Sequence, residues 1–233
     1  GCRVLSNITL PSGLTTLGQS AFYNCIALNN ISIPSGITTI NSSTFQGCTS
    51  LSQVTLPSTL KTINRQAFVN CSALTQITFP NGLQTIADEV FADCGLTSIT
   101  IPASVTSIGT NPFLRCKSLA SIEVVAGNTT YASNGYDAII DIANKELITG
   151  CSSTLIPTDG SVRVIGVASF AGLNLIGIEI PDPILSIGKG AFSECENLQS
   201  VHIASTNLKN VDEGIFYGSK IGSKIMINSE YLA

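Results

Sequence analysis

The sequence predicts an α/β repeat solenoid, with about ten short parallel strands on one face and turns with short helical or 3₁₀ segments on the other. Two observations predict it, the recurrence of one short phrase and the period of the prolines that close it. These prolines are Pro11, Pro34, Pro57, Pro80, Pro102, Pro157 and Pro181. The first five stand 23, 23, 23 and 22 residues apart. A fixed period in the low twenties is typical of a solenoid, so we expect a single array over residues 1–233.

Each repeat opens with a short strand. In residues 28–34, Ile31 and Ile33 alternate with Asn30 and Ser32, which is the period of two that a strand requires. The proline that follows cannot donate a ladder hydrogen bond, so the strand ends there. The ten strand candidates end near Leu10, Ile33, Leu56, Phe79, Ile101, Val124, Ile156, Ile180, Ile203 and Ile227.

The stretch after each strand returns the chain to the next repeat. Ile37, Ile40 and Phe45 are separated by three and five positions, which suits a turn followed by a short helical or 3₁₀ segment. One unit has too few apolar groups to bury by itself. Because stacking places equivalent residues such as Phe45 and Phe68 side by side, we expect the core to form only between neighbouring repeats.

The recurring order Leu-x-x-Ile-x-Ile resembles the leucine-rich repeat. The fuller phrase "IPSGITTINSSTFQGCTSL" is similar to the BspA-like, treponemal-type class of that repeat, and the similarity covers nearly the whole chain. The turn after the strand lacks the usual Asn or Cys, so no asparagine ladder is expected there. The resemblance implies a surface protein of a bacterium or protist, in a group with several members implicated in adhesion. It therefore implies an extracellular or cell-surface location, for which the first residues carry no signal pattern.

Composition argues against several other classes. Charged residues make up 11% of the chain, the formal net charge is −4, and there is no run of Lys or Arg. Nothing therefore neutralises phosphates, and nucleic acid is not an expected partner. No apolar stretch approaches the roughly 18 residues that span a bilayer, so direct membrane insertion of this segment is not expected.

The cysteines follow the repeat. Seven occupy one slot, three residues after the phenylalanine wherever that residue is present: Cys2, Cys25, Cys48, Cys71, Cys94, Cys116 and Cys195. We expect a buried stack of free thiols, because cysteine behaves as a small apolar residue. Cys151 lies outside this register and is expected in the core of an insert. No His or Cys-x-x-Cys stands beside the slot, so no metal is expected.

The repeat is interrupted over residues 125–153, which we expect to be irregular and to carry a β-hairpin insert. Asn134-Gly135 is a strong turn signal, and "DAIID" and "ELITGC" have the character of two paired strands. We expect the hairpin to project from one side as a structural decoration, with a dedicated binding element as the alternative. Its acidic residues lack the order of a calcium loop: Asp137, Asp141 and Glu146.

The resemblance places the outward side chains of the strands on a concave face, which is the expected binding surface. Its N-terminal half carries small hydroxyl and amide groups, and its C-terminal half carries charges. The candidate partner-binding residues are Thr55, Thr78, Thr100, Glu123, Glu179, Asp182, His202 and Lys224. Glu179 and His202 are equivalent positions of adjacent strands, so we expect them to form a surface ion pair. The alternative is that the polar rows only stabilise the sheet through cross-strand pairs.

The resemblance, together with the exposed polar sheet, implies a non-enzymatic recognition or adhesion module, secreted or on the cell surface, that binds a protein or glycan through its concave sheet. Catalysis and a cofactor are not expected, because the chain has a single His, no activated nucleophile beside it and no phosphate loop. The alternative is a structural spacer or stalk that displays another domain.

Overall fold

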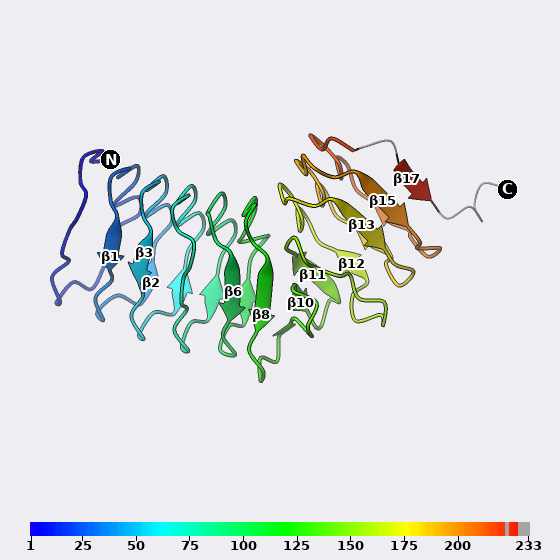
Figure 1. Ribbon diagram of the computed structural model, residues 1–233. Helices are drawn as coiled ribbons and strands as arrows, with labels where there is room; N and C mark the ends of the chain where they lie inside the picture. The colour runs from blue at the N-terminus through cyan, green and yellow to red at the C-terminus, as the bar shows by residue number, and fades with distance from the viewer. Residues whose placement is uncertain (222–223, 228–233) are drawn as a thin grey trace.

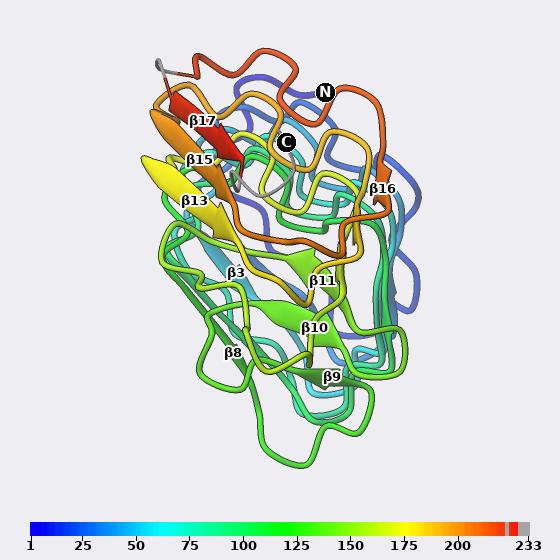
Figure 2. The same ribbon diagram turned by 90° about the vertical axis from the view of Figure 1, so that its right-hand side faces the viewer.

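The computed structural model describes residues 1–221 and 224–227. The chain forms a β-solenoid of about eight turns of stacked parallel strands, where the sequence predicted ten (Figure 1). The predicted repeat solenoid is confirmed. Two strand ladders run along it on opposite sides, and Figure 2 shows β13, β15 and β17 on one side and β16 on the other.

The first ladder, called the front ladder below, holds the strands that the sequence predicts. Its members are β1 (Asn30–Ser32), β3 (Gln53–Thr55), β6 (Ser98–Ile101), β8 (Ser121–Val124), β13 (Gly177–Ile180), β15 (Ser200–Ile203) and β17 (Lys224–Ile227). They form three parallel sheets, β1-β3, β6-β8 and β13-β15-β17. The candidates ending at Leu10, Phe79 and Ile156 are wrong as strands, since those segments make no regular ladder pairing in the structure. The front ladder is therefore discontinuous.

The second ladder occupies the return stretches, where the sequence predicted helical segments. Its strands are β2 (Thr39–Ile40), β4 (Thr62–Ile63), β5 (Thr85–Ile86), β7 (Ser107–Ile108), β12 (Val164–Ile165), β14 (Ser186–Ile187) and β16 (Asn210–Val211). None of the residues that the structure describes forms a helix. The predicted helical and 3₁₀ segments are therefore wrong, and the solenoid is built from strands and turns.

The backbone explains why these stretches are not helical. Ser43 and Gly47, on either side of Phe45, have φ angles of 55° and 76°. The next repeat places Gln66 and Asn70 in the same way, at 59° and 60°. A helix of L-residues cannot contain left-handed positions without a steric cost at each one. Two such positions in every turn hold this side of the solenoid in a series of tight turns.

Stacked phenylalanine rings fill the core. Ring centroids lie 5.4 Å apart from Phe22 to Phe45, 5.1 Å from Phe45 to Phe68, 5.2 Å from Phe68 to Phe91 and 5.6 Å from Phe91 to Phe113. The planes of the first pair are inclined by only 1°. Because each ring packs against rings of the neighbouring turns, the core forms between repeats, as the sequence predicts.

The cysteine slot lies beside these rings. Five of the buried thiols donate to the carbonyl oxygen of the phenylalanine in the preceding turn, as Cys48 does to Phe22 at 3.1 Å and Cys71 to Phe45 at 3.2 Å. All eight cysteines are free thiols in the structure. The predicted burial is confirmed for every member of the slot except Cys2, which is exposed because its turn has a neighbour on one side only.

The insert forms β9 (Tyr131–Ala132), β10 (Ile139–Asp141) and β11 (Glu146–Thr149). The predicted hairpin is confirmed, since β10 and β11 pair antiparallel. Its predicted projection is wrong. β11 pairs parallel with β12, so the hairpin joins the second ladder in the order β16-β14-β12-β11-β10-β9.

The hairpin is also part of the core. Ile139 belongs to the apolar cluster of the N-terminal turns, whereas the adjacent Ile140 belongs to that of the C-terminal turns. Cys151 is fully buried beside them, as predicted, and its thiol contacts the Asp137 carbonyl oxygen and the Ser153 hydroxyl. The insert therefore connects the two halves of the core.

Candidate binding surface

The front face, meaning the outward side of the front ladder, presents the rows of side chains that the sequence predicts. The strand registers align Ser32 with Thr55, Thr100 with Glu123, and Glu179 with His202. Thr55, Thr100, Glu123 and Glu179 are exposed, and His202 is half-buried. These side chains alternate with buried apolar residues, so strand geometry alone directs them to solvent.

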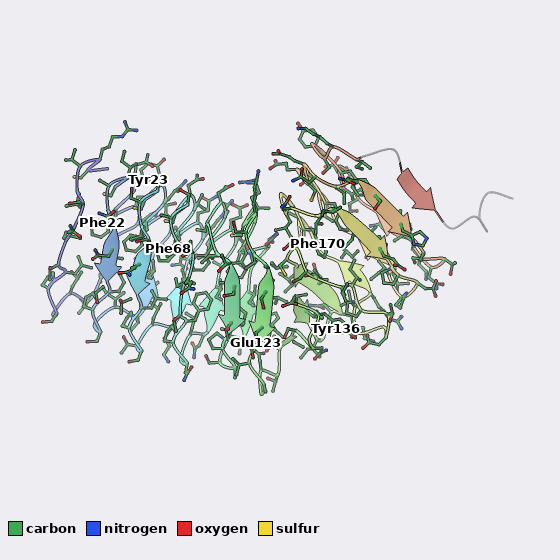
Figure 3. All side chains as sticks on the ribbon, viewed as in Figure 1. Phe22, Tyr23, Phe68, Glu123, Tyr136 and Phe170 are labelled. Carbon is green, nitrogen blue, oxygen red and sulfur yellow. The ribbon has the colours of Figure 1, made fainter. Side chains whose placement is uncertain are left out.

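The candidate residues do not share one sheet. Thr55 lies on β3, whereas Thr78 lies on the exposed segment that makes no ladder pairing. Thr100 and Glu123 lie on β6 and β8, and Figure 3 shows Glu123 on β8. Glu179, His202 and the backbone of Lys224 lie on β13, β15 and β17. The structure therefore divides the predicted surface into separate patches.

Glu179 and His202 are neighbours in register but do not form the expected ion pair. Their strands pair directly, yet neither side chain takes part in any ion pair or hydrogen bond among the described residues. Exposed pairs gain little energy in water and lose side-chain entropy when they form, so adjacency does not enforce the contact. Both polar groups remain open to solvent or to a partner.

Asp182 makes contacts within the fold. Its carboxylate accepts hydrogen bonds from the Thr206 backbone N–H at 3.0 Å, the Thr206 hydroxyl at 2.6 Å and the Asn207 amide at 3.2 Å. The Thr206 hydroxyl is the main reason that the pKa of Asp182 lies below its ordinary value. Among the predicted site residues whose side chains the structure describes, Asp182 is the one whose side chain forms hydrogen bonds within the fold.

A groove runs along the free side of β8 (called the β8 groove). Its volume is about 750 Å³, and it is lined by β8, the loop that follows and the insert. The side chain of Asp137 reaches β8 from the insert, accepting hydrogen bonds from the Ser121 hydroxyl at 3.0 Å and the Ile122 N–H at 3.2 Å. Ser133 accepts from the Val124 N–H at 3.1 Å. Sequence reasoning recognised the insert and not this groove.

The insert's acidic residues do not converge on a metal. Asp137 faces β8, whereas Asp141 and Glu146 are cross-strand neighbours in the hairpin. Burial, followed by the nearby charge of Asp141, raises the pKa of Glu146 above its ordinary value. Within the described ranges, no group of three or more His, Cys, Asp or Glu side chains is arranged to hold a metal ion.

The second ladder presents a polar row that sequence reasoning missed. The registers align Thr39, Thr62, Thr85 and Ser107 across β2, β4, β5 and β7. The available signal was the dipeptide Thr-Ile, or Ser-Ile, which recurs at the repeat period. Each of these strands has only two residues, which is too short for the alternation of polar and apolar residues that indicates a strand. Variants in this row can therefore serve as controls for variants in the front face.

Charged side chains bridge turns next to the interruption. Arg115 contacts both Asp93 carboxylate oxygens at 2.8 Å and lies 3.9 Å from Glu194. The hydrogen bonds to Asp93 are the main reason that the pKa of Arg115 is raised. Lys117 lies 3.3 Å from Glu196, so two ion pairs link the turn before the insert with one beyond it. These charges serve the fold and are not part of the front face.

The parallel ladders, the period of 22 or 23 residues and the phenylalanine column together define a leucine-rich repeat solenoid. The BspA type leucine rich repeat region matches residues 1–120 and 163–232 in six copies. The chain therefore belongs to the BspA-type leucine-rich repeat family. The unmatched residues include β8 and the insert, where the repeat is interrupted.

Several solved structures of leucine-rich repeat proteins share this fold. A leucine-rich repeat protein of Bacteroides ovatus is 26% identical, with a TM-score of 0.61, over 91% of this chain and 58% of its own. This chain thus spans 58% of the length of that protein. A leucine rich cell surface protein of Faecalibacterium prausnitzii is 24% identical, with a TM-score of 0.65, over 92% and 71% of the two chains. No curated protein matches the chain.

A leucine-rich repeat protein of Eubacterium ventriosum is 20% identical, with a TM-score of 0.56, and the match covers 79% of this chain and 66% of that one. At this identity the likeness establishes the shared fold. Over the part of the chain that is described, no helix is long and apolar enough to cross a membrane.

Proposed function

We propose that the protein is a recognition or adhesion module that binds a protein or glycan through its front face. The observation that carries this proposal is the exposure of the outward row that includes Thr55, Thr100, Glu123 and Glu179. These side chains contribute nothing to the buried core, so the fold alone does not account for the change from hydroxyls to charges along the row. Leucine-rich repeat proteins of this surface type are associated with protein interaction or adhesion.

The chemistry of the face favours many weak contacts. Its described rows carry Thr, Ser, Asn, Gln, Glu and His, without the Trp and Arg that usually dominate interface energetics. A long polar face gains affinity mainly when several contacts form at once. We place the strongest discrimination among partners at Glu123, Glu179 and His202, because these are the titratable groups among the described side chains of its strands.

A location outside the cell or on its surface fits this function. The related protein of Faecalibacterium prausnitzii is described as a cell surface protein. Leucine-rich repeat folds are typically non-enzymatic, and a binding role at the surface needs no catalytic group. We therefore place the binding partner on a host cell or a neighbouring cell.

Arrays of extracellular proteins and of glycans provide the test. The double variant Glu179→Lys/His202→Glu alters the front face, and Thr62→Lys/Thr85→Lys alters the second ladder to a similar extent. We expect the native chain to bind a subset of spots, the front variant to lose at least about tenfold in affinity, and the second-ladder variant to bind as the native chain does. Equal binding by all three proteins, or equal loss in both variants, would contradict the proposal.

A spacer role is the second candidate, and the regular packing favours it. Continuous stacks such as Phe45 on Phe68 on Phe91 make a stiff rod, which suits a stalk that displays another domain. A spacer needs rigidity and no specific surface. If no arrayed protein or glycan binds, and the front variants leave every measured function of the protein unchanged, the spacer role is the better account.

A further inference from the structure

The β8 groove lies along an open strand edge. In the sheets of the structure β8 pairs only with β6. The Val125 N–H donates to the Ile101 carbonyl oxygen, which fixes the side of the strand that faces β6. Because successive peptide groups of a strand point in opposite directions, the N–H and C=O groups of Ile122 and Val124 face the groove.

The insert provides hydrogen-bond partners for the N–H groups of this edge and not for its carbonyl oxygens. Asp137 and Ser133 accept hydrogen bonds from the Ile122 and Val124 N–H groups through their side chains. The carbonyl oxygens of the same two residues accept no hydrogen bond from any residue that the structure describes. This strand edge therefore offers a partner two free carbonyl oxygens as acceptors. It also offers two N–H donors once the Asp137 and Ser133 side chains move away from them.

The groove has the size and the side chains of a peptide site. Its volume of about 750 Å³ lies within the range usual for ligand sites. Two apolar side chains at its rim remain partly exposed, Val125 at 38% and Ile142 at 47%. They offer contact to an apolar side chain, while the backbone of β8 offers the hydrogen bonds of a strand.

The charge of the groove selects among peptides. Glu123 and Asp137 are its ionisable carboxylates, and its lining contains no Lys or Arg. A strand added beside β8 places one outward side chain next to Glu123, where a cation is favoured and an anion is repelled. The lining is therefore complementary to a basic segment.

We infer that the β8 edge binds an extended peptide carrying Lys or Arg, which adds to the sheet as a strand. This inference rests on the proposed function in that the partner is a protein, and it adds the mode of binding and the chemistry of the segment. Asp137 and Ser133 act as removable caps. The peptide's N–H groups bond to the Ile122 and Val124 carbonyl oxygens, and its own carbonyl oxygens replace the caps.

The test measures the affinity of the full chain for fluorescent peptides. The probe is acetyl-Ser-Thr-Val-Lys-Ile-Thr-Ser-amide. One control peptide has Glu in place of Lys, and another has alternate backbone nitrogens methylated. We expect the probe to bind with an affinity that weakens as salt rises, and each control to bind at least about tenfold less tightly. Failure of the probe to bind at millimolar concentration, or equal binding of the methylated peptide, would overturn the inference.

Protein variants separate edge pairing from simple charge attraction. Glu123→Gln is expected to weaken probe binding about tenfold, and Glu213→Gln, which alters an exposed carboxylate in the turn after β16, is expected to leave it unchanged. Ser133→Ala removes a cap and is expected to keep or raise the affinity. A large loss in Ser133→Ala with its thermal stability intact would overturn the inference, as would equal effects of the two Glu variants.

The two proposals fail separately. If the probe does not bind but the arrays show binding that depends on Glu179 and His202, only the β8 inference is wrong and the caps simply protect the edge from pairing. If the probe binds with the expected variant pattern while the front-face variants bind the arrays as the native chain does, the β8 inference is supported and the front-face proposal is wrong.

Discussion

Asn111 donates its side-chain amide to the backbone carbonyl oxygen of Ala168, which lies 57 positions further along the chain. Nearby, the Arg115 N–H donates to the Ala171 carbonyl oxygen at 3.2 Å. The turn before the insert therefore stacks directly on the turn after it. The extra chain enters only on the strand sides of the solenoid, and Figure 1 shows the strands from β13 onward tilted relative to β8. The insert therefore lies between the front strands of the two halves, while the turns before and after it remain stacked on each other.

Removing the Asn111 side chain tests this junction. Asn111 is 3% exposed and also accepts hydrogen bonds from the Phe113 N–H and the Thr149 hydroxyl. Asn111→Ala leaves the buried Phe113 N–H and Thr149 hydroxyl without partners, so we expect a loss of about 2–4 kcal/mol in the free energy of unfolding, measured with urea. Asn197→Ala is the control, because the hydrogen bond from its side-chain amide to Asn174 is exposed to solvent. A loss below about 1 kcal/mol in Asn111→Ala would contradict the junction.

The phenylalanine column predicts a dependence on position. Phe68 is fully buried between Phe45 and Phe91, whereas Phe22 has a ring neighbour on one side only. Phe68→Ala opens a cavity between two turns and is expected to cost about 3–5 kcal/mol by urea unfolding. Phe22→Ala is expected to cost less. Equal losses would show that stacking between turns is not what holds the core.

Burial makes the thiols of the cysteine slot unreactive, except for the exposed Cys2. It raises the pKa of Cys48 to about 12 and that of Cys195 to about 11, and it moves the pKa of Cys94 and Cys116 upward as well. At pH 8 these thiols are therefore protonated, and the thiolate is the form that reacts. With iodoacetamide and mass spectrometry, we expect rapid modification of Cys2 alone in the folded chain, and of all eight cysteines in guanidinium. Rapid labelling of a buried cysteine would contradict this packing.

The hairpin predicts a dependence on pH. Because the folded pKa of Glu146 is raised, its ionisation costs stability as pH rises through that value, and costs nothing below the unfolded pKa. Glu146→Gln removes this cost and the repulsion from Asp141. We expect a gain of up to about 1 kcal/mol in unfolding free energy at pH 7 and no gain at pH 3. Glu179→Gln, which is exposed, is expected to change little at either pH; a gain for Glu146→Gln that is larger at pH 3 would contradict the assignment.

The sequence predicted the stacking of the fold more fully than its return path. Alternation around Ile31 and the recurrence of Phe45 and Phe68 are local signals, and they correctly located most strands and the core column. The left-handed positions at Ser43 and Gly47 are set by tight turns within each repeat, and side-chain spacing does not report backbone φ. A period of three to five residues therefore suggested a helix where the chain makes turns and a two-residue strand.

The sequence predicted which residues line up along the candidate surface, but not which of their side chains contact one another. The register of Glu179 beside His202 follows from equal positions in the repeat. Whether two exposed side chains touch depends on rotamers and solvation, which the repeat does not fix. The β8 groove was missed because Asp137 reaches Ile122 across 15 positions of irregular chain. No periodic signal extends over such a segment.

The most direct test of the front-face account is hydrogen exchange of the whole chain, with and without the tightest-binding arrayed protein or glycan. The account predicts slower amide exchange in β8, β13 and β15 on binding, and unchanged exchange in β4 and β5 on the opposite side. Slower exchange confined to β4 and β5, with the front strands unaffected, would contradict it.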